Sequence, residues 1–336
     1  MKRHINNILV TGGAGFIGSA FIRYLLAQKD FSGTIVNLDL LTYAGDLKNL
    51  STIENDPRYI FNRGNICDGK LVEKICNDHQ IDTIVHFAAE THVDRSIEGP
   101  FPFIETNVYG TFTLLEIVKK RPHIHFHHIS TDEVYGSLGM EGFFDETSPY
   151  KPNSPYSAAK AASDHFVRAY FKTYDISMTL SHCSNNYGPC QHMEKLIPTI
   201  IFCLMEKKSI PVYGNGKNVR DWLFVDDHAD AIWQILKFGE KGQTYDIGGG
   251  VELSNIDLIK LIIKKYAETA QKSEDEFLPL ISFVADRLGH DFRYAIDNSK
   301  IQKELKWSPK FTLLEGIKQT IDWYVNNNLF CLQEKI

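Results

Sequence analysis

Tyr156 and Lys160 lie four residues apart in a segment with helical periodicity, so both side chains would lie on one face of a helix. A phenol with a pKa of about 10 is a poor base at neutral pH, but a nearby cation favours the phenolate and lowers that pKa. Such a phenol could take a proton from a substrate hydroxyl. The same spacing also occurs on ordinary solvated helices, so the pair alone does not decide the function.

A second group of reactive side chains, Ser130, Thr131, Asp132 and Glu133, lies at the carboxyl end of the strand expected over 125–130. The carboxyl ends of strands in an open α/β sheet face the ligand crevice. Two adjacent carboxyl groups in different environments can act as one acid and one base, which is what an elimination requires. The alternative is a hydroxyl that caps a helix beside a solvated acidic turn.

Three glycines, Gly12, Gly15 and Gly18, come directly after the first predicted strand and open a helix. In such a turn the glycines allow a tight bend, close approach of a pyrophosphate, and close packing of helix on strand. A strand-to-helix turn can also use glycine for backbone reasons alone. Asp39, which lies 21 residues beyond Gly18, would accept hydrogen bonds from a ribose and repel a 2'-phosphate. The sequence therefore predicts a dinucleotide site for NAD rather than NADP.

Short β-branched runs alternate with helical periodicity through the first half of the chain, which is typical of βαβ units. The expected strands are 8–11, 34–40, 59–62, 83–88 and 125–130, and the expected helices begin at Phe16 and span 101–120 and 156–174. The predicted fold is α/β, with a doubly wound parallel (Rossmann) sheet and a smaller C-terminal α/β substrate-binding lobe. We expect the first domain to span 1–182. The lobe would take most of 183–336, with some segments returning to the first domain, helices at 227–237, 255–268 and 313–326, and a polar surface loop at 270–276.

Composition narrows the class of protein. Lys and Arg number 36 against 42 Asp and Glu, a net charge of -6, so the chain has no basic surplus for a nucleic-acid backbone. No apolar run approaches the roughly 20 residues of a membrane span, and the N-terminus reaches its glycines too soon for a signal peptide. We expect a cytoplasmic protein that binds neither nucleic acid nor membrane.

The cysteines and histidines do not predict a metal site. The six cysteines form no C-x-x-C pair, which favours reduced thiols over a disulfide framework or a zinc cage. His123, His125, His127 and His128 could share a strand face, but no acidic or cysteine partner completes a ligand set nearby. We therefore expect no metal.

The glycine motif, the Tyr-x-x-x-Lys pair and the Ser-Thr placement resemble the extended short-chain dehydrogenase/reductase family. Within it, the chain is similar over nearly its whole length to the dTDP-glucose 4,6-dehydratases. The segments that carry the resemblance are 41–45, 88–96, 128–136, 183–189, 194–198, 220–222 and 286–291. The triplet Thr131, Asp132 and Glu133 is the most specific of them, because epimerases and decarboxylases of the superfamily lack both acids.

The resemblance implies a role for each of five catalytic residues. Tyr156, supported by Lys160 and Thr131, would deprotonate the glucose 4-hydroxyl while NAD takes a hydride from C4. Glu133 would then remove the C5 proton, Asp132 would protonate the departing 6-hydroxyl, and the hydride would return to C6. The alternatives are another nucleotide-sugar 4,6-dehydratase acting on UDP-glucose, a 4-epimerase, and a non-catalytic NAD-binding protein.

The resemblance also implies which residues bind the two ligands. Those expected at the cofactor are Gly12, Gly15, Phe16, Ile17, Gly18, Asp39, Leu40, Leu41, Thr42, Asn65, Ile66, Phe87, Ala88, Ala89, Glu90, Thr91, Thr106, Tyr156, Lys160 and Asn186. Those expected at the nucleotide-sugar substrate are Thr91, Thr131, Asn185, Lys195, Leu196, Pro211, Val212, Tyr213, Arg220, Asn255, Asp286, Arg287 and His290.

A few positions depart from the family pattern. Asn65 stands where an Asp usually reads the adenine amino group, and Thr91 replaces a common Ser. Met193 and Phe292 replace a Pro and an Arg near the nucleotide end, where thymidine and uridine would be distinguished. The resemblance further implies a homodimer that pairs the helices 101–120 and 156–174 with their copies.

Overall fold

The computed structural model describes residues 3–327 and contains a large parallel sheet. Its seven strands run in the order β10-β6-β5-β4-β1-β2-β3. Their bounds are β1 (Asn7–Thr11), β2 (Thr34–Asp39), β3 (Tyr59–Arg63), β4 (Thr83–His86), β5 (His125–Thr131), β6 (Ser177–Cys183) and β10 (Thr244–Ile247). Every pairing between neighbours is parallel, so the predicted doubly wound α/β fold is confirmed.

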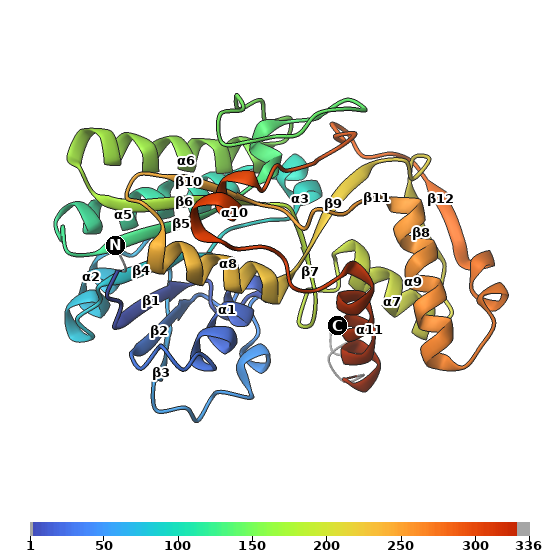
Figure 1. Ribbon diagram of the computed structural model, residues 1–336, viewed down its shortest axis with the longest axis horizontal. Coiled ribbons are helices and arrows are strands. Elements are labelled where there is room, and N and C mark those ends of the chain that lie inside the picture. Colours follow the sequence, from blue (N-terminus) through green and yellow to red (C-terminus); the bar gives the residue numbers. More distant parts are fainter. Residues whose placement is uncertain (1–2, 328–336) are drawn as a thin grey trace.

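Helices cover both faces of this sheet (Figure 1). On one face α2 (Gly69–Asp78), α5 (Thr111–Lys119) and α6 (Pro155–Tyr174) enclose a core with residues such as Leu114 and Val167. On the other face α1 (Phe16–Leu26) packs against α8 (Val225–Phe238) around Phe21 and Trp233. Because both faces are covered, successive residues of β4 and β5 are all buried, instead of every second one.

The expected single helix over 101–120 is wrong in detail. The segment contains α4 (Phe101–Phe103), π-helical turns at Ile104–Gly110, and then α5. Within the wide turns the buried side chain of Asn107 accepts from the Glu90 amide at 2.8 Å and donates to the Glu90 carbonyl at 3.0 Å. These bonds fix the loop after β4, and π-helical turns are often found at such functional positions.

The second lobe is built on smaller sheets with its own apolar core. A three-stranded sheet runs β11 (Glu252–Ser254), β9 (Val219–Phe224), β7 (Asn185–Tyr187), and β8 (Ile210–Tyr213) pairs with β12 (Ile281–Val284). The helices beside them are α7 (Leu196–Met205), α9 (Asn255–Ala270) and α11 (Leu313–Asn326). The polar stretch after α9 includes a short 3-10 turn at Glu274–Glu276.

Two segments after residue 183 return to the large sheet, namely α8 and β10, and α10 (Ser299–Leu305) packs on β10. A return of this kind was expected, whereas the domain division at 182/183 stays a prediction. Over residues 3–327, no helix has both the length and the apolar character required to cross a bilayer.

The histidines of β5 are part of the interior of the sheet. His125 lies 2.9 Å from the Ser177 hydroxyl and 3.0 Å from that of Thr179, and His127 lies 2.9 Å from the same Thr179 hydroxyl. Residues 3–327 hold no group of three metal-ligating side chains. The five cysteines in that range are free thiols, and Cys331 lies outside it.

Candidate active site

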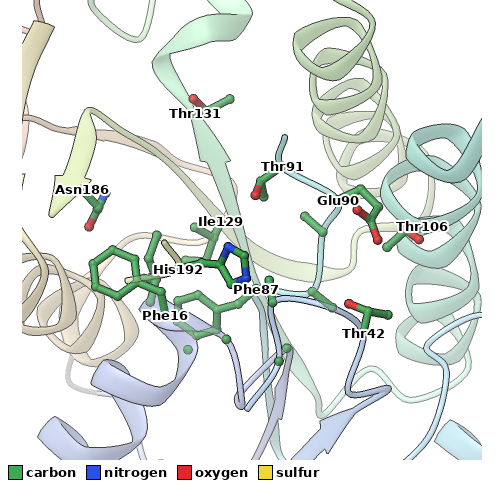
Figure 2. Close-up of a pocket in the computed structure, with 18 of the residues that line it drawn as sticks. Phe16, Thr42, Phe87, Glu90, Thr91, Thr106, Ile129, Thr131, Asn186 and His192 are labelled. Atoms are coloured by element: carbon green, nitrogen blue, oxygen red, sulfur yellow. The ribbon is translucent and has the colours of Figure 1, made fainter. Parts of the chain in front are cut away.

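A cavity of about 320 Å³ runs along the carboxyl ends of the central strands, beside the second lobe. In Figure 2 Thr131 lies at the end of a strand, with Asn186 on one side of the cavity and Thr42, Glu90 and Thr106 on the other. The cavity brings together all five expected catalytic residues, every expected cofactor residue except Leu41, and the expected substrate residues Thr91, Thr131, Asn185 and Lys195. Residues that are distant in sequence thus form one site.

The glycine turn between β1 and α1 packs against neighbouring backbone too closely for a side chain at Gly12 or Gly18. Gly12 has φ +71°, and a Cβ built there would lie 2.6 Å from backbone atoms of Ala88. A Cβ at Gly18 would lie 2.3 Å from the Gly12 carbonyl oxygen, so the helix can pack only on glycine. The N-cap residue is Gly15, which has no side-chain cap, so the first amides of α1 face the cavity uncapped. This cradle fits the pyrophosphate of NAD.

Asp39, at the end of β2, is held by backbone amides. One carboxylate oxygen accepts from Ala14 at 2.9 Å and the other from Leu41 at 2.8 Å. Burial raises the pKa of Asp39, and the two amides oppose that rise. Leu41, with φ +55°, contributes its amide here rather than a side chain to the cavity. Each carboxylate oxygen keeps a lone pair for a ribose hydroxyl, so Asp39 fits NAD better than NADP.

Asn65 lies further along the same side of the cavity. Its amide oxygen accepts from the Cys67 backbone at 2.9 Å. A second lone pair on that oxygen can take an adenine amino group, without the charge assistance that an Asp would give. The substitution therefore fits the adenine but weakens its hydrogen bond.

Tyr156 and Lys160 lie together in the first turns of α6. Ser154 and Ser157 form a capping box that fixes the start of this helix. The Lys160 ammonium donates a 2.7 Å hydrogen bond to the Ile129 carbonyl oxygen, and both side chains are buried. This bond ties α6 to β5 just before the Thr131–Glu133 turn.

The expected lowering of the Tyr156 pKa by Lys160 is wrong for this structure. Burial raises that pKa well above its usual value, and the Glu133 carboxylate raises it further. A hydrogen bond with Thr131 acts in the opposite direction. Desolvation of the phenolate is the largest cause of the rise, and the hydrogen bond with Thr131 favours deprotonation.

The side chains of Asp132 and Glu133 are adjacent in sequence but have different surroundings. Burial raises the pKa of Asp132 well above its usual range, helped by Glu133 and Asp221. Oδ2 of Asp132 is buried and has no hydrogen-bond partner among the described residues, which disfavours the ionised carboxylate further.

Burial also raises the pKa of Glu133, but three cations oppose it: Arg220, Lys195 and Arg287. Asp132 is thus favoured as the acid and Glu133 as the base, which is the division that an elimination needs. The alternative interpretation of this segment was a capping hydroxyl beside a solvated acidic turn. Thr131 does cap the short 3-10 turn Asp132–Tyr135. The turn is not solvated, however, because Asp132 is only 2% exposed.

Most of the expected substrate residues of the second lobe lie beyond the cavity lining. They are Leu196, Pro211, Val212, Tyr213, Arg220, Asn255, Asp286, Arg287 and His290. Arg220 donates to the Asp291 carbonyl at 3.0 Å, Arg287 pairs with Asp94 at 2.6 Å, and His290 pairs with Asp286 at 2.7 Å. The positive charges of Arg220 and Arg287 still lower the pKa of Glu133, so both side chains lie near that carboxylate.

The family model described as GDP-mannose 4,6 dehydratase matches residues 9–320. A dTDP-glucose 4,6-dehydratase of Haemophilus influenzae is 47% identical over 336 residues, covering 96% of this chain and 98% of that protein. The chain belongs to the dTDP-glucose 4,6-dehydratase family.

Solved structures of the family agree with this assignment. A dTDP-glucose 4,6-dehydratase of Bacillus anthracis in complex with NAD is 46% identical, with a TM-score of 0.88 and coverage of 97% of this chain and 98% of that one. The enzyme of Streptomyces venezuelae, with NAD and TDP bound, is 44% identical, with a TM-score of 0.89 and coverage of 96% and 98%.

The sequence analysis missed one residue that lines the cavity, Glu194, and one that lies outside the lining beside Arg220, Tyr294. Glu194 lines the cavity, with a carboxylate oxygen 3.6 Å from His192 and 3.8 Å from Arg95. Tyr294 donates to Asp291 at 2.6 Å, and its ring lies 4.4 Å from the Arg220 guanidinium. Glu194 was detectable as the charged neighbour of Lys195, whereas Tyr294 had no local signal.

Proposed function

We propose that this protein converts dTDP-glucose to dTDP-4-keto-6-deoxyglucose and water. The observation that carries the proposal is the pair Asp132 and Glu133, whose surroundings favour one acid and one base in the cavity that also holds Tyr156. NAD, when bound, supplies reversible hydride transfer, taking a hydride from C4 and returning it to C6. The residues of the chain supply binding and proton transfers.

Tyr156 acts on the sugar 4-hydroxyl. Its phenol has to lose a proton in a buried site that disfavours the anion, so its partners decide its reactivity. Thr131 hydrogen-bonds the phenol, and Lys160 places a positive charge one turn along the same helix. The pair thereby holds the proton acceptor beside C4.

Glu133 and Asp132 then divide the elimination between them. A ketone at C4 acidifies the hydrogen on C5, and Glu133 accepts that proton because Arg220, Lys195 and Arg287 favour its ionised form. Asp132, kept neutral by burial, gives its proton to the departing 6-hydroxyl. When the hydride returns to C6, Glu133 gives its proton back to C5. The proton that Tyr156 takes from the 4-hydroxyl then offsets the one that Asp132 gives to the departing water, so protons balance over the whole reaction.

The same cations serve the substrate diphosphate. Lys195 and Arg287 are partly exposed, and the planar guanidinium of Arg287 can bind two phosphate oxygens at once. Within residues 3–327 the buried side-chain oxygen of Asn185 has no hydrogen-bond partner, so it can accept a hydrogen bond from a ligand. These residues fit a nucleoside diphosphate at the second-lobe end of the cavity.

The proposal includes a homodimer in the cytoplasm. Apolar side chains are exposed along α4 to α6, among them Phe101 (69%), Tyr109 (52%) and Tyr174 (50%). A symmetric pairing of these helices would bury them. NAD and nucleotide sugars are both available in the cytoplasm. Analytical ultracentrifugation tests the dimer, and cell fractionation tests the cytoplasmic location.

The test is to incubate the purified protein with dTDP-glucose, without added NAD, and to follow the sugar by mass spectrometry and proton NMR. Loss of one water with a new C6 methyl signal is the expected result, and it would also show retained cofactor. Parallel incubation with UDP-glucose separates the two nucleotides. A 4-epimerase would leave the mass unchanged, and a non-catalytic NAD-binding protein would leave both sugars intact even with NAD added.

A further inference from the structure

A row of buried charges lies behind the catalytic turn, outside the cavity lining. His182 on β6 has Nε2 at 3.2 Å from the Asp164 carboxylate of α6 and Nδ1 at 2.8 Å from the Asp246 carboxylate of β10. All three side chains are fully buried. Burial opposes a charged imidazole, but the two carboxylates outweigh it and raise the pKa of His182 to about 9. The row is therefore carboxylate, imidazolium, carboxylate.

This row contacts the chain on both sides of the catalytic triplet Thr131–Glu133. Immediately before the triplet, the Ser130 hydroxyl donates to Asp164 at 2.8 Å. Two residues after it, the Tyr135 hydroxyl donates to Asp246 at 3.0 Å and lies 2.8 Å from Nδ1 of His182. The turn that carries the acid and the base is thus held at both ends by the same group of charges.

The row also reaches the helix that carries the tyrosine and lysine. Asp164 lies one helical turn beyond Lys160 on α6, and its charge supports the ammonium of Lys160 against burial. Asp164 therefore joins α6 to the catalytic turn, in addition to the bond from Lys160 to the Ile129 carbonyl. These contacts therefore fix Tyr156 and Lys160, which act in the oxidation, relative to Asp132 and Glu133, which act in the elimination.

A buried group of charges contributes little to the stability of the fold, because the cost of desolvation cancels most of the attraction and apolar side chains often stabilise as well. The position of this group beside the catalytic turn suggests a functional role instead. We propose that Asp164, His182 and Asp246 form a positioning network that holds Asp132 and Glu133 in register with Tyr156 and Lys160. None of the three lines the site, so they are positioning residues, and the inference rests on the proposed function.

Two matched variants separate positioning from simple stability. Tyr135→Phe removes the hydroxyl that anchors the far end of the catalytic turn. Tyr150→Phe removes a hydroxyl that contacts Asp164 at 3.0 Å and His182 at 2.7 Å, but from the segment before α6 rather than from the turn. Each change removes one hydroxyl that contacts the buried charges, but only Tyr135→Phe removes a contact made by the catalytic turn itself.

We expect Tyr135→Phe to slow the elimination while the 4-hydroxyl is still oxidised. Displacement of a reacting group by about 1 Å costs on the order of a hundredfold, so a loosened turn should cost about tenfold to a hundredfold. In a single turnover, the reduced nicotinamide should then accumulate and be visible by its near-ultraviolet absorbance, while KM changes little. Tyr150→Phe should show no such accumulation, although thermal denaturation reports a comparable loss of stability for both.

The outcomes are distinct. Equal accumulation in the two variants, or none in either, would overturn the positioning role. If the unmodified protein removes no water from the sugar, the proposed function fails and this inference fails with it. Should Tyr135→Phe not fold, Ser130→Ala frees the near end of the turn and is judged by the same accumulation.

Discussion

The hydroxyl of Tyr43 donates a 3.2 Å hydrogen bond to the Glu194 carboxylate, joining the loop after β2 to the segment before α7. The Arg95 guanidinium lies 3.8 Å from the centre of the Tyr43 ring and 3.8 Å from Glu194. Both neighbours of Tyr43, Thr42 and Ala44, line the cofactor cavity. Three segments of the chain therefore meet beside the cavity.

Breaking this junction should release the cofactor faster. Tyr43→Ala removes a cation–π contact worth about 0.5–1 kcal/mol and a hydrogen bond worth about 1 kcal/mol, so NAD dissociation should rise about tenfold. The measurement is the dissociation rate of NAD, followed by trapping the released cofactor. Phe238→Ala, an exposed aromatic residue at the end of α8 and away from the cavity, is the control. An unchanged rate would show that the junction does not retain NAD.

Removing either elimination group should separate oxidation from water loss. Asp132→Asn removes the acid and Glu133→Gln the base, and general acid–base groups contribute about 10²- to 10⁴-fold. We expect product formation to fall by that factor, while reduced nicotinamide forms on addition of dTDP-glucose. Tyr156→Phe is the contrasting variant, which should form neither. Normal water loss by Asp132→Asn would contradict the role of Asp132.

The pH dependence should follow from the same pair. Glu133 must be ionised, and burial raises its pKa, so kcat falls as pH decreases through that raised value. Asp132 must be protonated, and its pKa is raised well above its usual range, so kcat falls as pH increases through it. The profile should be bell-shaped. In Asp132→Asn, the residual activity should no longer fall at alkaline pH. If it still falls, the alkaline limb of the profile belongs to a group other than Asp132.

Local sequence patterns predicted most of the fold. The β-branched runs and the three glycines give β1, β2, β4 and β5 within a few residues, because period and turn chemistry are local properties. The spacing of Tyr156 and Lys160 gave their shared helix face for the same reason. The π-helical turns at Ile104–Gly110 were missed, because they are accompanied by tertiary contacts such as those of Asn107 with Glu90.

The electrostatics of the site could not be predicted from the sequence. The pKa of Tyr156 depends on burial and on Glu133, which is distant along the chain but adjacent in space. Asp164, His182 and Asp246 come from three elements, with separations of 18 and 64 residues. The junction of Tyr43 with Glu194 spans 151 residues. Only the fold brings such groups together, so their charges and partners become visible in the structure alone.

The buried imidazolium predicts how stability changes with pH. His182 has a pKa of about 9 in the folded protein against about 6.5 when unfolded, so its contribution is fully present below about pH 6.5. That contribution is lost as pH rises through about 9, because the folded state must then release its extra proton. We expect the free energy of unfolding to fall by a few kcal/mol across this window, as measured by denaturant titration. His182→Gln should be less stable at pH 6.5 and should lose this dependence. His165→Gln, an exposed histidine of α6, should retain it, and a wild-type stability that is flat over the window would show that His182 is neutral in the folded protein.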